Sequence, residues 1–142
     1  MKISEKIRQT ALETITTESK AAEALKNSVN QDFIDAVEII YKTQGRVIIT
    51  GIGKSAHIAS KIVATLNSTG TPAIFMHAAD AIHGDLGIVR KDDVVIAISK
   101  SGETPEIKVL VPLIKSRGNY LIAIVGNIDS YLALQSDKVL NV

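Results

Sequence analysis

Five short, almost wholly apolar runs rich in β-branched residues alternate with helical segments in the last two thirds of the chain. The runs are Val47 to Thr50, Ala73 to Met76, Val94 to Ile98, Leu121 to Val125 and Val139 to Val142. Continuous apolar strands separated by helices are typical of a parallel sheet covered on both faces. Because crossovers between parallel strands are right-handed, the pattern predicts an α/β fold with a doubly wound, five-stranded parallel sheet. Ligands of such sheets bind at the carboxyl ends of the strands.

Two helices are predicted before the first strand. Apolar residues recur at helical spacing from Ile3 to Leu25, and after a break at Asn27 to Asn30 a second apolar stripe runs from Phe33 to Tyr41. Further along, Ser130 is expected to cap a short helix that extends to Gln135. Pro112 lies in the middle of the helical segment between the third and fourth strands, where we expect a bent helix.

Composition excludes several classes of function. With 142 residues and neither linker nor repeat, the chain is expected to form one domain over residues 1–142. Zero cysteines exclude disulfides and thiolate metal sites. The 16 basic and 15 acidic residues form no long run and aromatic residues are few, which argues against a nucleic-acid partner. The N-terminus is charged and no apolar run is long enough to span a membrane, so we expect a cytoplasmic protein with no membrane contact.

The first predicted strand runs directly into Gly51-Ile52-Gly53-Lys54-Ser55 and then into a helix. Glycines allow a sharp turn and a close approach of backbone to ligand, and the free N–H groups at the helix start point toward an anion. Lys54 supports an anion site, because a cation in the first turn of a helix opposes the macrodipole unless an anion offsets both. The alternative is a solvated lysine beside an ordinary tight turn.

Two known nucleotide-binding loops fit this turn poorly. A Walker A loop requires a glycine five residues before Gly53, and Ile48 occupies that position. The dinucleotide fingerprint G-x-G-x-x-A is matched by Gly51, Gly53 and Ala56. However, the second strand ends in Met76-His77 rather than in the acidic residue that binds a ribose. Binding of a nucleotide-linked sugar is left open by this imperfect match alone.

A second polar turn follows the third predicted strand. Its last residues, Thr104 and Pro105, are a natural N-cap and a natural first helical residue, which is ordinary helix-start chemistry. Ser99, Ser101 and Gly102 add two hydroxyl groups and a flexible backbone at the carboxyl end of a central strand. Hydroxyls together with helix-end amides suit a phosphate monoester, whose oxygens are all acceptors. We therefore expect the two turns to bind one phosphate group.

The loop after the second strand contains His83-Gly84-Asp85-Leu86-Gly87. Histidine gives and takes protons near neutral pH, and a glycine-flanked loop can carry it into a cleft. A single loop histidine is more commonly a surface or capping residue, so spacing alone favours that interpretation. His57 and His77 are more ordinary, and the three histidines show no metal-ligand spacing.

Together the three motifs resemble the sugar isomerase (SIS) domain, and in particular its arabinose-5-phosphate isomerase branch, from about Ile34 to Val142. The serine-glycine turn is shared by all such domains, whereas G-x-G-K-S with H-G-D-L-G is specific to this branch. The resemblance implies a flavodoxin-like strand order, no organic cofactor, no metal, and a small sugar phosphate as the partner. It implies interconversion of D-arabinose 5-phosphate and D-ribulose 5-phosphate for the biosynthesis of Kdo, lipopolysaccharide and capsule.

The resemblance also implies roles for individual residues. His83 and Glu106 become candidates for the acid and base that open the sugar ring and move a proton through an enediol, and Glu106 would need burial to raise its pKa. The implied catalytic residues are His83, Glu106 and Lys54, and the implied phosphate-binding residues are Gly53, Ser55, Ser99, Ser101, Gly102 and Thr104.

Relative to this family the chain stops immediately after the fifth strand, at Val142. Family members continue through a helix and a loop that supply acidic and histidine residues to the active site, and many add a pair of CBS domains. A missing cover helix would leave an apolar patch, so we expect a homodimer or homotetramer in which the long N-terminal helix reaches a neighbour. The alternative function is a catalytically inactive, sugar-phosphate-binding regulatory module, since the same fold serves as an effector sensor in transcription regulators.

Overall fold

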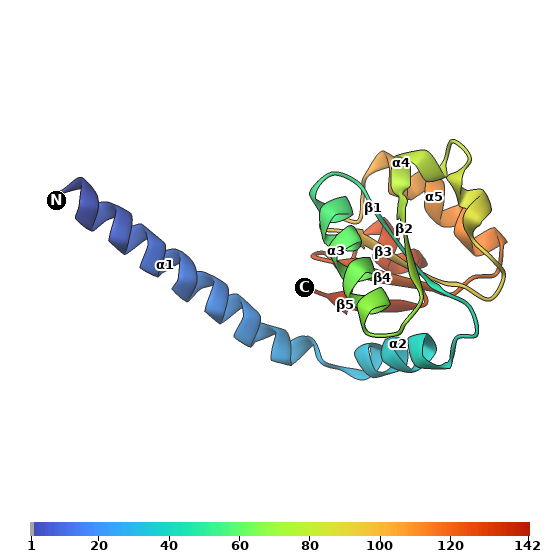
Figure 1. Cartoon of the computed structure of the whole chain (residues 1–142), viewed down its shortest axis with the longest axis horizontal. Helices are drawn as coiled ribbons and strands as arrows, with labels where there is room; N and C mark the ends of the chain where they lie inside the picture. The colour runs from blue at the N-terminus through green and yellow to red at the C-terminus, as the bar shows by residue number, and fades with distance from the viewer. Residues whose placement is uncertain (1) are drawn as a thin grey trace.

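A computed structural model describes residues 2–142 and contains a five-stranded parallel sheet with helices on both faces (Figure 1). The strands are β1 (Val47–Gly51), β2 (Ala73–His77), β3 (Val94–Ser99), β4 (Leu121–Val125) and β5 (Lys138–Asn141). Their order in the sheet is β2-β1-β3-β4-β5, and every neighbouring pair is parallel. The predicted doubly wound sheet is confirmed, and the strand boundaries differ from the predicted ones by at most one residue.

The helices include both of those predicted at the N-terminus. They are α1 (Ile3–Ala24), α2 (Gln31–Lys42), α3 (Lys54–Ser68), α4 (Ala78–Ala81), α5 (Pro105–Ser116) and α6 (Tyr131–Gln135), with 3-10 turns at Leu25–Ser28 and Asp85–Ile88. Ser130 caps α6 as predicted, because its hydroxyl accepts a hydrogen bond from the amide of Ala133. The helix around Pro112 is also confirmed, since α5 continues past this exposed residue.

Helices cover the sheet in two layers, and the alternation of side chains along each strand assigns residues to these layers. Ile49 and Ile96 pack on the side of α2 and α3. Ile48 and Val95 pack on the side of α4, α5 and α6. The same alternation continues to the strand ends, and it places Thr50 of β1 and Ser99 of β3 on the α5 side.

A buried ion pair fixes the amino-terminal end of the sheet. Asp93 is 2% exposed, and one of its carboxylate oxygens lies 2.6 Å from Nη2 of Arg46. The carboxylate also accepts hydrogen bonds from the backbone amides of Arg46 and Arg90, each at 2.8 Å. Burial raises the pKa of Asp93, but the hydrogen bonds from Arg46 and Arg90 outweigh it, so that the pKa lies below its ordinary value. The pair therefore stays charged at neutral pH and joins the start of β1 to the start of β3.

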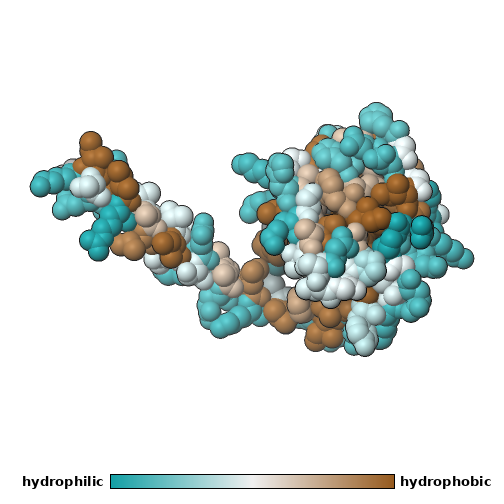
Figure 2. All heavy atoms as spheres, viewed as in Figure 1, coloured by the Kyte–Doolittle hydropathy of each residue, from teal (hydrophilic) through white to brown (hydrophobic). Residues whose placement is uncertain are grey.

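The first helix, α1, projects away from the sheet (Figure 1). Of its described residues none is buried, and Ile3, Ile7 and Ile15 are all more than half exposed. Hydrophobic residues accordingly stand out along this helix in Figure 2. No helix among residues 2–142 has the length and apolar content that crossing a membrane requires.

Candidate functional site

The two polar turns leave the same edge of the sheet side by side. β1 and β3 are hydrogen-bonded neighbours, with Thr50 opposite Ala97. Both strands run in the same direction, so the Gly51–Ser55 turn and the Ser99–Thr104 turn emerge together at their carboxyl ends. The turns lead into α3 and α5, and the two helix starts therefore lie at this one edge of the sheet.

The turn after β1 is shaped by glycine. Gly53 has a φ of +60°, which favours glycine, and among the described atoms nothing lies within 4 Å of the place where a side chain would begin. A Cβ on Gly51 would lie 3.0 Å from the backbone of Ser55, so the turn folds tightly onto the first turn of α3. Within residues 2–142 no side chain caps α3 at Gly53, so no cap side chain accepts a hydrogen bond from its first amides. Gly53 and Lys54 are exposed and Ser55 is half-buried.

In the turn after β3 two serines brace the backbone. The hydroxyl of Ser99, which is 4% exposed, accepts a hydrogen bond from the Gly102 amide at 3.1 Å. The hydroxyl of Ser101 accepts one from the Glu103 amide at 3.2 Å. A serine hydroxyl that accepts one bond keeps its own proton, so both serines retain an O–H for a ligand oxygen. Gly102 has a φ of +67°, and a Cβ there would meet Oγ of Ser130 at 2.1 Å.

Two buried threonine hydroxyls at this edge have no hydrogen-bond partner among residues 2–142. Thr104 precedes α5 as predicted, but its side chain accepts no hydrogen bond from the helix amides, so it is an N-cap by position only. Thr50 is fully buried and lies on the same face of the sheet as Ser99. A buried hydroxyl without a partner costs about 1–3 kcal/mol, which a ligand or water oxygen would offset. Thr50 was not among the residues expected at the site, although strand alternation alone places it on the same face of the sheet as Ser99.

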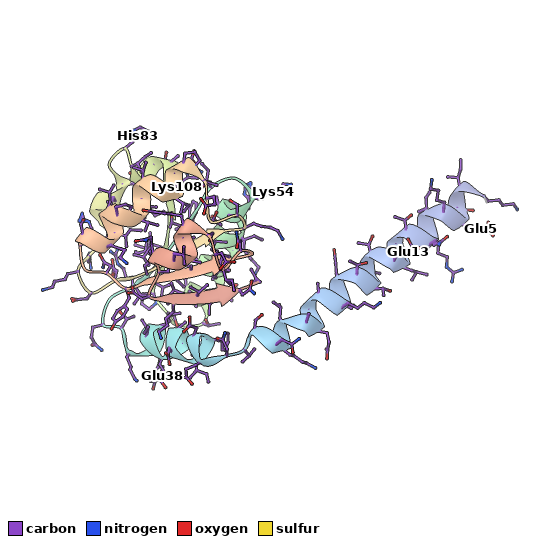
Figure 3. All side chains as sticks on the ribbon, turned by 180° about the vertical axis from the view of Figure 1, so that it is seen from behind. Glu5, Glu13, Glu38, Lys54, His83 and Lys108 are labelled. Atoms are coloured by element: carbon purple, nitrogen blue, oxygen red, sulfur yellow. The ribbon has the colours of Figure 1, made fainter. Side chains whose placement is uncertain are left out.

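The candidate acid–base residues do not gather around the turns as closely as the hydroxyls do. Glu106 lies in the first turn of α5 and is half-buried. His83 is exposed in the loop after α4. Figure 3 shows His83 and Lys54 at different sides of the domain, each pointing outward. A single chain therefore brings the hydroxyls together but leaves Lys54 and His83 apart.

No group of His, Cys, Asp or Glu side chains within the described residues is arranged to hold a metal ion. A cavity of about 630 Å³ lies elsewhere, at the amino-terminal ends of the strands, where Lys42, Lys91 and Tyr120 help to line it. It is separated from both polar turns by the length of the sheet. Its lysines are mixed with carboxylates such as Glu38 and Asp92, so the cavity does not present the uniform positive charge that a phosphate group would favour.

Comparison with known proteins relates the chain to one family. The SIS domain family model matches residues 39–142. The arabinose 5-phosphate isomerase KdsD of Pseudomonas aeruginosa is 50% identical over 123 residues, which cover 87% of this chain and 38% of that protein. KdsD of Francisella tularensis is 49% identical over 134 residues, covering 92% of this chain and 41% of that protein. The chain thus spans about two fifths of the length of these curated relatives.

Among solved structures, an Escherichia coli protein in complex with arabinose 5-phosphate superimposes with a TM-score of 0.91. It is 42% identical to this chain, and the match covers 99% of this chain and 74% of that one. The fold described above, including the long N-terminal helix, is therefore shared with a protein whose structure holds this ligand.

Proposed function

The chain belongs to the SIS domain family, and from that premise we propose that it binds D-arabinose 5-phosphate and interconverts it with D-ribulose 5-phosphate. One observation carries the proposal: two polar turns lie side by side, with unpartnered or proton-bearing hydroxyls at the carboxyl ends of β1 and β3. The names of the curated relatives and the arabinose 5-phosphate complex of the solved structure support this choice of sugar phosphate.

The hydroxyl groups of the two turns complement a phosphate. Its oxygens are acceptors only, and Ser99, Ser101 and Thr104 each hold a hydroxyl proton for donation. Backbone amides at the starts of α3 and α5 add further donors, and the helix dipoles favour negative charge there. Lys54 and Ser55 extend the site from the β1 side. The sugar itself would lie beyond the phosphate, toward Glu106.

The proposed reaction moves a proton from C2 to C1 and another from the C2 oxygen to the C1 oxygen, and it needs no redox partner. A base removes the proton from C2 of the open-chain aldose while the C1 carbonyl oxygen gains a proton, which gives an enediol. A proton then returns to C1 while the C2 hydroxyl loses its proton and becomes the ketone. We assign the base to Glu106 and ring opening to His83. Since Lys54 and His83 lie apart in one chain, a neighbouring copy would have to supply one of them for both to act in one site.

The first test measures conversion and binding together. Purified protein is mixed with D-arabinose 5-phosphate, ribulose 5-phosphate formation is followed, and the binding constant is measured by titration calorimetry. Ser101→Ala is expected to weaken binding about 10-fold or more, because it removes a hydrogen bond to a charged group. Ser116→Ala, at the far end of α5, is the matched control and should bind as the wild type does. Binding without conversion would favour the regulatory module, and no binding by the wild type would overturn the proposal.

We further propose that α1 mediates assembly of a homodimer or homotetramer. Ile7 and Ile15 lie on one face of α1 and are 66% and 60% exposed, so a second copy is the simplest cover for them. Ile7→Glu with Ile15→Glu is expected to yield monomers in analytical ultracentrifugation. The melting temperature of the sheet domain should remain nearly unchanged, because α1 has no residue buried against it among those described. Gln9→Glu with Thr16→Glu, on the opposite face, is the control. A double Ile variant that sediments as the wild type does would contradict this role.

A further inference from the structure

We propose that Glu103 and Lys108 form a latch that fixes the phosphate-binding turn against α6 and neutralises the carboxylate which that turn would otherwise present to the phosphate. The inference rests on the proposed function, since it assigns a positioning role at the same site. The sequence motif implies no role for Glu103, which lies between Gly102 and Thr104 in the turn.

The two carboxylate oxygens of Glu103 contact two different helices. One oxygen accepts a hydrogen bond from the backbone amide of Tyr131 at 2.6 Å, at the first residue of α6. The other lies 2.6 Å from Nζ of Lys108, which is one turn into α5 (Figure 3). Hydrogen bonds from Lys108 and from the Tyr131 amide lower the pKa of Glu103, so the group is a carboxylate at neutral pH.

The neighbouring residue of the turn is held by the same helix. The carbonyl oxygen of Gly102 accepts a hydrogen bond from the Leu132 amide at 3.1 Å, and its Cα packs against Ser130. Gly102 and Glu103 are thus both fixed to the start of α6. Ser101 and Thr104 flank Gly102 and Glu103. The positions of their hydroxyls therefore depend on contacts with residues nearly thirty positions further along the chain.

Charge explains why the latch includes a lysine. A carboxylate within a turn that binds a phosphate dianion repels the ligand unless a cation compensates it. Lys108 is that cation. The side chains of Lys108 and Glu103 are 48% and 43% exposed, and solvated pairs of this kind add little to folding stability. Removing Lys108 should therefore weaken anion binding without lowering the melting temperature appreciably, a combination that a purely structural ion pair would not produce.

Lys115 provides a matched control in the same helix. It extends from α5 to α6, where its Nζ donates to the carbonyl oxygen of Gln135 at 2.6 Å. Lys115 lies at the far end of α5 from the phosphate-binding turn and is exposed. Each of these two lysines of α5 thus makes one polar link to a neighbouring segment, and only Lys108 pairs with a residue of the turn.

The experiment measures affinity for inorganic phosphate and for D-arabinose 5-phosphate by titration calorimetry at low salt. Lys108→Met is expected to weaken both affinities about 3- to 10-fold, because an uncompensated charge then faces the ligand. Glu103→Gln combined with Lys108→Met should restore most of the loss, since the amide oxygen can still accept from Tyr131. Lys115→Met should bind as the wild type does. The thermal midpoint of each variant confirms that it is folded.

The positioning role has its own readout. Glu103→Ala should increase hydrogen exchange at the Tyr131 amide, whereas Glu103→Gln should leave that amide protected. The latch is overturned if Lys108→Met binds phosphate as tightly as the wild type does, or if the double variant binds no better than Lys108→Met. If the wild-type chain binds neither ligand, both the proposed function and the role of the latch are wrong. If the wild type binds both ligands and the variants bind them with the same affinity, only the role of the latch is wrong.

Discussion

Gly102→Ala is expected to weaken binding of D-arabinose 5-phosphate about 100-fold or more. Gly102 has a φ of +67°, and an added Cβ would lie 2.1 Å from Oγ and 2.5 Å from Cβ of Ser130. Neither neighbour is the end of a long flexible side chain, so the turn itself must move away from α6. Such a displacement misaligns the hydroxyls of Ser99, Ser101 and Thr104 together, and each bond to a charged group contributes about 1.5–3 kcal/mol.

The control for this substitution is Gly70→Ala. Gly70 also has a positive φ, +93°, but no described atom lies within 4 Å of the place where its Cβ would stand, and it follows α3 at the end away from the turns. Its substitution should destabilise the fold by about 1 kcal/mol through backbone strain alone and leave affinity unchanged. Titration calorimetry with circular-dichroism melting separates the two effects. If Gly102→Ala bound as tightly as Gly70→Ala, the turn after β3 could not be the phosphate site.

Asp93→Ala should lower the free energy of unfolding by about 3–5 kcal/mol, because it leaves the partly buried guanidinium of Arg46 without its partner. The substitution also removes the acceptor for the amides of Arg46 and Arg90, which hold the amino-terminal ends of β1 and β3. Urea unfolding at pH 7 measures the loss. Asp92→Ala, one residue away and exposed, is the matched control and should change the free energy by less than about 0.5 kcal/mol. Equal effects of the two substitutions would contradict this role.

The same ion pair makes the free energy of unfolding depend on pH in the acid range. The pKa of Asp93 is lower in the folded than in the unfolded chain, so its contribution is fully present above the unfolded value of about 4. It is lost as the pH falls below that value toward the folded pKa. The wild type should therefore lose stability on acidification below about pH 4. Asp93→Asn should be less stable at neutral pH and show a flatter decline in the acid range.

The fold could be predicted from sequence because local patterns determine most of it. The apolar runs predict the five strands, and the segments between them predict the connecting helices. The right-handed crossover rule predicts how the helices are divided between the two faces of the sheet. The same rules place Gly53 and Ser101 at one sheet edge, since parallel strands end together. Short elements carry too little periodicity for their bounds to be predicted, and the bounds of α4 and of the 3-10 turn at Asp85–Ile88 come only from the structure. The position of His83 depends on these elements.

Sequence patterns do not predict contacts between residues that are distant in the chain. Glu103 meets the Tyr131 amide, and Arg46 meets Asp93, only because the sheet brings their strands together. The free hydroxyl of Thr104 is a further example. Its sequence context indicates an ordinary N-cap, and only the structure shows that the side chain does not accept from the helix amides. Local propensity identifies where a helix begins, but the surrounding packing determines what the first side chain does.

We propose that the turns after β1 and β3 together bind one phosphate group. The most direct test is a titration of isotope-labelled protein with inorganic phosphate, followed by amide proton and nitrogen chemical shifts. We predict that the largest changes fall on Ser55 and on residues 101–104, with one common binding constant for the two turns. Changes concentrated instead on Lys42, Lys91 and Tyr120, around the cavity at the opposite end of the sheet, would contradict the claim.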